Sequence, residues 1–357
     1  MHPFSTPRFF PVIPKRWQRL PIWVAAVTAL IFATGCVSSQ GLANRIAKAP
    51  NLQYPSLSDK ECQQWLRMLF RGKDPFLHLT IPVGPPEAKL SVLELPPVDY
   101  QIVVWSKVSR QTNGIKDFCV GVAEKTNAVV TPLKERGTIV LLPGYMMQKE
   151  TMLPWALVLA QAGYRVVLVD VRGHGQSTGR TFTAGKVETA DLIQLLDYLT
   201  AWKLSDAEVG VLGHSFGADL GLYWAARDPR VKTVVAIAPY NKPEEAIPRF
   251  AKEMKWPVST NKLQKAIALA ESKLGIKWAD WTAAAAVGNM KTPVLFIGGG
   301  KDTISPPEDL QLLERAAPAG SKVLVIPEAN HFVIGMWFQG LTQPVKEWFQ
   351  QHLRPPE

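Results

Sequence analysis

The sequence has few cysteines, no long basic run and no long apolar run. Cys62 and Cys119 have no further cysteine or histidine at metal-ligand spacing, so no metal site is expected. The basic residues form neither finger-type spacing nor a helix interleaved with aromatic residues, which argues against nucleic-acid binding. With 47% hydrophobic and 20% charged residues, the 357-residue chain has an ordinary globular composition and room for one large α/β domain with additions.

Acidic residues are missing from the first 35 positions, which carry four of the chain's 40 basic residues. Without that segment, 36 basic and 30 acidic residues remain, so the formal net charge falls from +10 to +6. This moderate excess is consistent with a mild attraction to anionic lipid surfaces.

An uncharged stretch, Leu20–Gly35, directly precedes Cys36. It is shorter than the roughly 20 apolar residues of a spanning helix and fits a signal peptide at 1–35. Its end, FATGC, resembles a bacterial lipobox, although Ala33 stands where that pattern prefers leucine. The resemblance implies cleavage after Gly35 and a diacylglycerol on Cys36. Val37, which is not the aspartate linked to inner-membrane retention, favours a lipid-anchored protein on the outer membrane, facing the periplasm.

Two alternatives to this interpretation stay open. The less favoured alternatives are a short N-terminal membrane helix and an ordinary signal peptide followed by an incidental cysteine. Once Cys36 is lipidated, Cys62 and Cys119 either pair in the oxidising periplasm or remain two separate buried thiols.

The chain after Cys36 divides into three parts. Residues 36–56 are small and polar, which predicts a tether. Residues 57–136 carry a capping box, Ser58 with Glu61, that predicts a helix over about 58–71. Proline-rich loops, which include Pro82, are expected to follow. Strands are expected in this part at Leu90–Leu95 and Gln101–Lys107, with weaker signals at Cys119–Val122 and Ala128–Val130. The third part, 137–350, has a regular pattern.

In that third part, apolar runs alternate with helical stretches. Strands are expected at Thr138–Leu142, Arg165–Asp170, Val209–Gly213, Lys232–Ala238, Val294–Ile297 and Lys322–Ile326, and helices at Glu188–Trp202 and Pro307–Ala316. Continuous apolar strands separated by helices predict a mostly parallel, twisted sheet covered on both faces. Ligands of such sheets bind at the carboxyl ends of the strands.

Ser215 lies in a G-x-S-x-G pattern, Gly213 to Gly217, between an expected strand and an expected helix. A serine on a strained strand-to-helix turn needs neighbours without Cβ atoms. The helix N-terminus also brings free N–H groups beside the hydroxyl. Ser215 is therefore a candidate nucleophile that needs a base.

Two histidines follow strands of the regular region, His174 and His331. His331 comes after the last strand and is the preferred base, whereas His174 is its competitor. Asp302 follows the strand before it and is the candidate acid. The order Ser215, Asp302, His331 is the order expected when a serine nucleophile lies on such an elbow.

These landmarks, GHSFG, GGGKD and EANH, together with DVRGHGQSTG at 170–179, resemble the α/β-hydrolase superfamily and its serine-aminopeptidase and lysophospholipase-like branch. The resemblance covers about residues 137–350. It implies the α/β-hydrolase fold, a triad of Ser215, Asp302 and His331 without a cofactor, and an oxyanion hole made by the backbone N–H groups of Tyr145 and Phe216. The residue before the serine in the elbow, His214, would point away from the site.

A long insertion, residues 241–291, stands where this superfamily carries a cap. Leu263, Ile267, Ala270 and Leu274 form a helical apolar stripe, and Gly275 would end that helix. The opposite side carries Lys262, Lys265 and Lys273. The helix is either packed on the domain or a mobile, lipid-facing lid. The insertion also contains three tryptophans, which either shape an apolar pocket or belong to the core: Trp256, Trp278 and Trp281.

The predicted function is therefore serine hydrolysis of carboxylic esters, lipid-like ones included, by a membrane-tethered enzyme. A peptidase, a thioesterase or an acyltransferase would use the same triad. No acidic cluster that would capture a substrate amino terminus is evident, which favours an ester over a peptide. A non-catalytic envelope lipoprotein is the alternative from another class. Nothing in the sequence indicates the oligomeric state.

Overall fold

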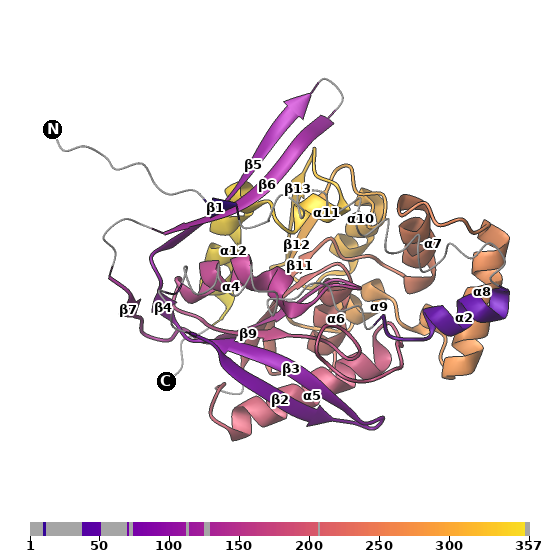
Figure 1. The fold of residues 1–357 in the computed structure, drawn as a ribbon, viewed down its shortest axis with the longest axis horizontal. Helices are drawn as coiled ribbons and strands as arrows, with labels where there is room; N and C mark the ends of the chain where they lie inside the picture. The colour runs from indigo at the N-terminus through magenta and orange to yellow at the C-terminus, as the bar shows by residue number, and fades with distance from the viewer. Residues whose placement is uncertain are drawn as a thin grey trace.

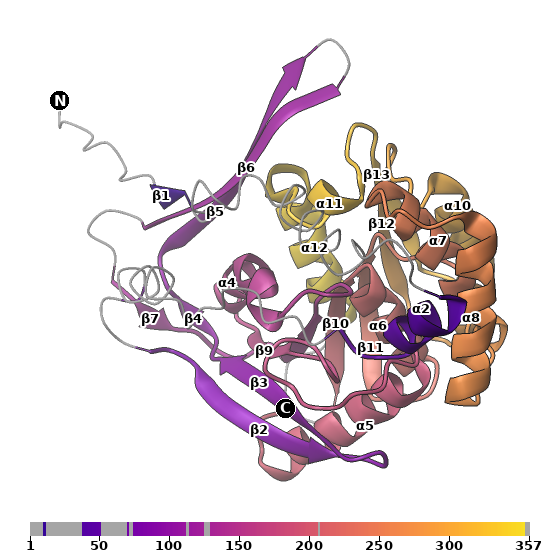
Figure 2. The same cartoon turned by 45° about the vertical axis from the view of Figure 1, so that its right-hand side comes forward.

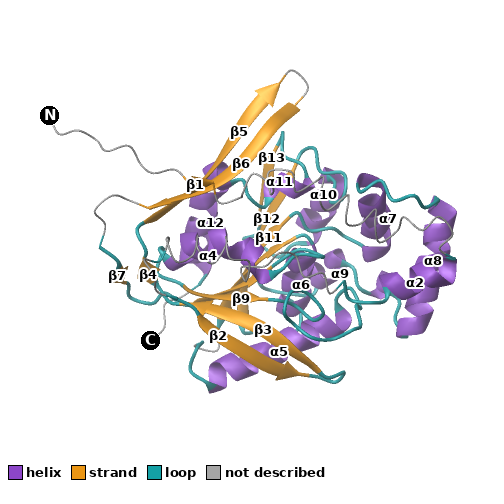
Figure 3. Ribbon diagram, in the orientation of Figure 1, coloured by secondary structure: helices purple, strands orange, loops and turns teal. Residues whose placement is uncertain are grey.

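The computed structural model describes residues 10–11, 38–50, 70, 74–111, 114–124, 129–205 and 208–353. Its centre is an eight-stranded sheet with the order β13-β12-β11-β10-β8-β9-β3-β2 (Figures 1 and 3). The strands are β2 (Leu77–Val83), β3 (Ala88–Leu95), β8 (Thr138–Leu142), β9 (Arg165–Val169), β10 (Val209–His214), β11 (Val231–Ile237), β12 (Val294–Gly299) and β13 (Lys322–Ile326). From β9 to β13 the neighbours are parallel, whereas β2 and β3 join antiparallel. The expected mostly parallel sheet is confirmed.

Both faces of the sheet are covered by helices. Since successive residues of a strand face opposite sides, each strand contributes side chains to two hydrophobic cores. In β8, Ile139 and Leu141 belong to one hydrophobic core and Val140 and Leu142 to the other. The first core contains α4 (Leu153–Ala160), α11 (His331–Ile334) and α12 (Phe338–His352). The second contains α5 (Lys186–Ala201), α6 (Phe216–Ala225) and α10 (Pro307–Ala316).

The insertion between β11 and β12 contains α7 (Pro243–Glu253), α8 (Thr260–Leu274), the 3-10 helix η3 (Trp278–Asp280) and α9 (Ala283–Gly288). The expected apolar stripe lies in α8, where its members pack into the core, and Gly275 ends the helix with a φ of 62°. The helix α9 packs against α6 and α10. It therefore belongs to the layer on the sheet, and the cap proper is shorter than residues 241–291.

The structure differs from the expected tether at 36–56, because Ser39–Ile46 forms the helix α2. Ser38 caps it, with its side chain accepting a hydrogen bond of 3.1 Å from the N–H of Gly41. Leu42, Ala43 and Ile46 form a buried stripe that the polar residues around them conceal in the sequence. This stripe packs against α8, and the two helices lie side by side in Figures 1 and 2. Residues 36, 37 and 51–56 lie outside the described residues.

Two further expectations at the beginning of the domain are wrong. Pro82 lies within the strand β2 rather than in a loop; β2 is an edge strand, where proline removes no ladder hydrogen bond. Of the weak strand signal at 128–130, residues 129 and 130 belong to no strand, and residue 128 lies outside the described residues. A two-residue strand, β7 (Thr131–Pro132), follows and pairs with β4 (Val98–Asp99). The expected helix over 58–71, apart from residue 70, lies outside the described residues.

A second sheet joins β5 (Ile102–Gln111), β6 (Gly114–Glu124) and the two-residue strand β1 (Phe10–Pro11) in the order β1-β6-β5. The hairpin of β5 and β6 extends away from the main body in Figures 1 and 2. Trp105 lies across from Gly121, where a Cβ would overlap its ring. Among the helices that the structure describes, none has the combination of length and apolar character that crossing a bilayer requires.

Candidate active site

Ser215 stands on a sharp turn between β10 and α6. Its φ of 54° and ψ of −122° lie in a region of backbone conformation that residues other than glycine rarely adopt. The turn is held because the N–H of Ser215 donates to the carbonyl of Ile237, at 2.8 Å, and its own carbonyl accepts from the N–H of Ala218, also at 2.8 Å. The strained backbone is thereby fixed from both sides.

The two glycines of the elbow are required by the close approach of backbone segments. A Cβ at Gly213 would overlap the carbonyl of Gly217, and a Cβ at Gly217 would overlap the carbonyl of Leu142. The elbow therefore presses directly against the end of β8, which leads to Tyr145.

His331 and Asp302 meet Ser215 in a continuous hydrogen-bonded row. The hydroxyl of Ser215 donates to His331 Nε2 at 2.8 Å, and His331 Nδ1–H donates to Asp302 Oδ2 at 2.8 Å. Both His331 and Asp302 are buried, with 5% and 3% of their surface exposed. This arrangement can take the proton from a serine hydroxyl and hold the imidazolium that results.

Asp302 is aimed by its own loop after β12. Its Oδ1 accepts hydrogen bonds from the N–H groups of Ile304 (2.9 Å) and Ser305 (2.8 Å), so that Oδ2 is left for His331. The Ser305 hydroxyl in turn donates to the carbonyl of Ala238 at 2.8 Å, which ties this loop to the end of β11.

His174, the competing base, does not contact Ser215. Its Nδ1–H donates to the carbonyl of Arg172 at 3.0 Å, and its ring stacks on Phe216 with 6.0 Å between the ring centres. Burial lowers the pKa of His174 to about 4, so its ring is neutral at physiological pH. The structure therefore brings His331, and not His174, to the serine.

Comparison with known proteins agrees with this fold. The family model described as "Serine aminopeptidase, S33" matches residues 134–280. The Pyrococcus furiosus esterase Pf2001 superimposes with a TM-score of 0.59 at 17% identity, over 86% of this chain and 98% of that one. The chain therefore has the α/β-hydrolase fold. The expected resemblance is confirmed at the level of the fold.

Two other similar proteins extend the comparison. An uncharacterised 31.7 kDa Escherichia coli protein from the traX-finO intergenic region is 24% identical over 259 residues, which are 60% of this chain and 91% of that protein. A bacterial membrane phospholipase A has a TM-score of 0.51 at 12% identity, and the match covers 93% of this chain and 92% of that one. Both matches extend over most of the partner protein.

The two expected oxyanion donors come from two different segments, the start of α6 and the turn after β8. Phe216 is the first residue of α6, a position whose N–H has no acceptor within the helix. Tyr145 lies in the turn after β8, and Met146 follows it with a φ of 63°. Because Gly217 packs on the end of β8, this turn and the start of α6 are neighbours, and their role as oxyanion donors stays a prediction.

Asp170 holds the segment that follows this turn. Its Oδ1 accepts from the N–H of Lys149 at 2.6 Å, and its Oδ2 accepts from the Lys149 ammonium at 2.8 Å. Asp170 and Lys149 are both almost completely buried, so removal of Lys149 would leave the buried Asp170 carboxylate without the ammonium that compensates it. The N–H of Gln176 also donates to Asp170, at 2.9 Å. The DVRGHGQSTG motif thus positions the turn that carries Tyr145.

An aromatic wall, formed by Tyr145, Phe182, Phe216 and Phe250, joins the elbow to the cap. Phe182 lies 4.9 Å from Tyr145 and 5.1 Å from Phe216 between ring centres. Phe250, from α7 of the cap, lies 6.2 Å from Tyr145. The cap is anchored nearby by Arg249, whose guanidinium contacts Asp309 Oδ2 at 2.8 Å. A continuous set of ring contacts therefore runs from Phe216, the residue after Ser215, to the cap.

The three cap tryptophans have different surroundings. Trp278 is completely buried and donates from Nε1 to the carbonyl of Thr183 at 3.1 Å, so it belongs to the core. Trp256 contacts Phe250 edge to face. Trp281 lies under the guanidinium of Arg227, 4.2 Å from its ring centre.

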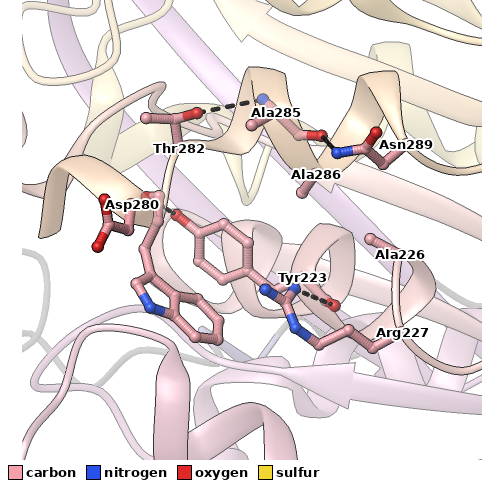
Figure 4. Close-up of a pocket in the computed structure, with 9 residues that line it drawn as sticks. Tyr223, Ala226, Arg227, Asp280, Thr282, Ala285, Ala286 and Asn289 are labelled. Atoms are coloured by element: carbon pink, nitrogen blue, oxygen red, sulfur yellow. Dashed lines mark hydrogen bonds between the residues drawn. The ribbon is translucent and has the colours of Figure 1, made fainter. Parts of the chain in front are cut away.

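Trp281 also borders a pocket of about 260 Å³ at the far end of α6 (Figure 4). Tyr223 donates from its hydroxyl to the carbonyl of Trp281 at 2.8 Å across this pocket. Tyr223 is eight residues beyond Ser215 on the helix, which corresponds to about 12 Å along its axis. The pocket is lined by neither Ser215, Asp302 nor His331 and is separate from the catalytic row.

His214, which was expected to point away from the site, supports the backbone of the catalytic histidine. Its Nε2–H donates to the backbone carbonyl of His331 at 3.2 Å. Burial lowers the pKa of His214 to about 4, so it remains neutral beside His331. Asn330 fixes the same backbone by accepting from the N–H groups of Phe332 and Val333. The sequence contains no signal for the contact of His214, because it depends on how two distant loops meet.

The structure tests neither the predicted pairing of Cys62 with Cys119 nor the predicted lipidation of Cys36. Cys119 lies in β6, with Sγ 3.8 Å from the carbonyl of Lys107. Cys62 and the lipidation candidate Cys36 lie outside the described residues, so their pairing and lipidation stay predictions. In the described ranges, no group of three or more histidine, cysteine or acidic side chains gathers as a metal site would require.

Proposed function

We propose that this α/β hydrolase is a serine hydrolase that cleaves carboxylic esters through an acyl-enzyme on Ser215. The observation that carries the proposal is the 2.8 Å contact from the Ser215 hydroxyl to His331 Nε2, continued at 2.8 Å to Asp302. A serine hydroxyl is a weak nucleophile, and such a row is what activates it. The buried position of His331 and Asp302 strengthens their interaction by excluding water.

In the first step, Ser215 Oγ attacks the ester carbonyl while its proton moves to His331 Nε2. Asp302 keeps the proton of the ring on Nδ1 and stabilises the imidazolium. The negative oxygen of the tetrahedral intermediate is bound by the N–H groups of Phe216 and Tyr145, each contributing about 3 kcal/mol to the lowering of the barrier. His331 then gives its proton to the leaving alkoxide, and the acyl group stays on Ser215.

In the second step, water attacks the acyl-enzyme. His331 Nε2 takes a proton from the water, the carboxylic acid leaves, and the Ser215 hydroxyl is restored with the proton from His331. Thioesterase, peptidase and acyl-transfer chemistry would proceed through the same acyl-enzyme and differ in the leaving group or the acceptor. Product analysis with candidate acceptors distinguishes them.

The aromatic wall favours an ester with an apolar acyl group. It begins at Phe216, the residue after Ser215, and at Tyr145, the second expected oxyanion donor, and it continues through Phe182 to Phe250 of the cap. Attachment to a membrane through Cys36, or through the apolar segment before it, would place the enzyme next to lipid-like esters. This part of the proposal rests on the sequence of residues 20–36.

The test is labelling by a fluorescent fluorophosphonate, followed by turnover of p-nitrophenyl esters of increasing chain length. The full chain is expected to label and Ser215→Ala to remain unlabelled. Ser205→Ala is the matched control, because Ser205 is a buried serine without a side-chain hydrogen bond, before β10. Equal labelling of Ser215→Ala, or no labelling and no turnover by the natural chain, would contradict the proposal and favour a non-catalytic lipoprotein.

A further inference from the structure

The helix α2 connects the predicted membrane attachment to the cap. Its N-cap, Ser38, comes two residues after Cys36, so at most about 7 Å of chain separates the two. This short link holds whether Cys36 carries a lipid or the apolar segment before it lies in the membrane. In either case the beginning of α2 must lie close to the lipid surface.

From that point, α2 packs directly on the cap helix α8 (Figure 2). Leu42 and Ala43 are completely buried in this contact region. Lys273 of α8 donates from its ammonium to Asn44 Oδ1 of α2 at 2.8 Å. Asn44 is six residues after Ser38, or about 9 Å along the helix. Lys273 is therefore held near the end of the chain that leads to the membrane.

The exposed side of α8 next to this contact is basic. Lys262, Lys265, Leu269 and Lys273 follow one another at intervals of three and four residues, so they share one side of the helix. Leu269 keeps 38% of its surface exposed between the lysines. Glu271, the one acidic residue of α8, accepts a hydrogen bond of 2.7 Å from the N–H of Trp278.

The adjoining segment, residues 38–50, contains no acidic residue. A row of lysines with an apolar residue among them is the pattern that lies on anionic lipid headgroups. A protein partner with an acidic surface would use the same charges. The lipid surface is favoured because the sequence attaches the chain to a membrane within two residues of α2.

We propose that the surface formed by α2 and the basic side of α8 rests against an anionic lipid bilayer. The proposal rests on the membrane attachment included in the proposed function. It places the cap toward the membrane, and the amino-terminal edge of the sheet, where β10, β12 and β13 begin, away from it.

The same segment leads to the wall of the active site. The N–H of Phe182 donates to the carbonyl of Ala47 at 3.1 Å, and the N–H of Ala49 donates to the carbonyl of Arg180 at 3.0 Å. Phe182 in turn contacts Tyr145 and Phe216. The segment after α2 thus braces the aromatic wall, and an ester that leaves the bilayer would meet this side of the protein first.

The experiment is photocrosslinking of the full chain in vesicles of phosphatidylcholine with and without phosphatidylglycerol. p-Benzoylphenylalanine replaces Leu269 in one sample and Trp202 in the other. Trp202 is the matched control, because it is exposed to a similar degree (46%) and lies directly after α5, before β10. Lipid crosslinks are counted by mass spectrometry, and ester turnover is measured on the same samples.

Position 269 is expected to crosslink to phosphatidylglycerol at least about fivefold more than position 202. Lys262→Glu with Lys265→Glu is expected to reduce the yield at 269 by at least about fivefold, since each lysine near an anionic surface contributes on that order. The control is Lys203→Glu with Lys322→Glu, which changes two exposed lysines near the amino-terminal strand ends. This control should leave the crosslinking yield at position 269 unchanged. Lys273 is retained because it contacts Asn44.

Equal crosslinking at 269 and 202 would overturn the orientation. Crosslinking at 269 that is unaffected by the charge reversal and equal in pure phosphatidylcholine would overturn the anionic surface. Loss of ester turnover together with normal crosslinking would contradict the catalytic proposal alone, so the two failures are distinguishable.

Discussion

Ser215 Oγ lies 2.8 Å from His331 Nε2, although 116 residues separate the two in the sequence. Ser215 follows β10 and His331 follows β13, and these strands are parallel members of one sheet. Their carboxyl ends therefore lie at one edge. Asp302 follows β12, next to β13, and reaches His331 from the neighbouring strand. The sheet order is what allows three distant loops to form one site.

Asp302→Asn is expected to lower kcat for a p-nitrophenyl ester by about ten-thousand-fold. Asparagine retains an oxygen that can accept from the N–H groups of Ile304 and Ser305, so the loop should keep its shape. It cannot stabilise the imidazolium of His331, and its NH₂ group selects the wrong ring tautomer. Steady-state turnover measures the effect. Asp280→Asn, at an exposed carboxylate of η3, is the control, and equal losses in both variants would contradict the assigned role.

Gly217→Ala is expected to abolish fluorophosphonate labelling and to lower the melting temperature. The added Cβ would overlap the carbonyl of Leu142, which is backbone and cannot move aside cheaply. The elbow would have to open, and Ser215 would leave its distance from His331. Gly288→Ala is the matched control, because a Cβ there meets nothing within 4 Å and alanine favours α9 by up to about 1 kcal/mol. Labelling of Gly217→Ala at the natural rate would show that the elbow tolerates the side chain.

Much of this site follows from local sequence patterns. The strands β8 and β13 begin and end where the apolar runs predict, as does the helix α10. Once these elements are placed, the positions of Ser215 and His331 at strand ends follow from the parallel order. The family landmarks then select His331 over His174.

Other features depend on contacts that no local pattern encodes. The helix α2 has eight residues, and its apolar stripe becomes meaningful only against α8. Pro82 suggests a loop until β2 is known to be the edge of the sheet. The hydrogen bond from His214 to the carbonyl of His331 joins two segments 117 residues apart. Each of these features is decided by tertiary packing, which overrides local preference.

The two buried histidines predict that the free energy of unfolding falls as the pH falls from about 6.5 to 4. Burial lowers the pKa of His174 and of His214 from 6.5 to about 4 in the folded protein. Between those values the unfolded chain binds protons that the folded protein does not bind, so acid favours unfolding. Each histidine contributes a slope of up to about 1.4 kcal/mol per pH unit, which ends below pH 4.

Urea unfolding at several pH values checks this contribution with His174→Phe. The variant loses the hydrogen bond to the Arg172 carbonyl and is expected to be less stable at pH 7. Its slope between pH 6.5 and 4 should nevertheless be smaller than that of the natural chain by about 1.4 kcal/mol per unit. An unchanged slope in His174→Phe would mean that His174 titrates in the folded protein.

Leu42→Ala tests whether α2 is part of the folded domain rather than a tether. Leu42 is completely buried among residues of the core that includes α8, so its truncation leaves a cavity and is expected to cost about 2–5 kcal/mol of unfolding free energy. Gln40→Ala, at an exposed position of the same helix, should change stability by less than about 0.5 kcal/mol. Urea denaturation measures both. Because α2 holds α8 and braces Phe182, Leu42→Ala should also reduce ester turnover below the unfolding midpoint, whereas a freely moving tether would leave both stability and turnover unchanged.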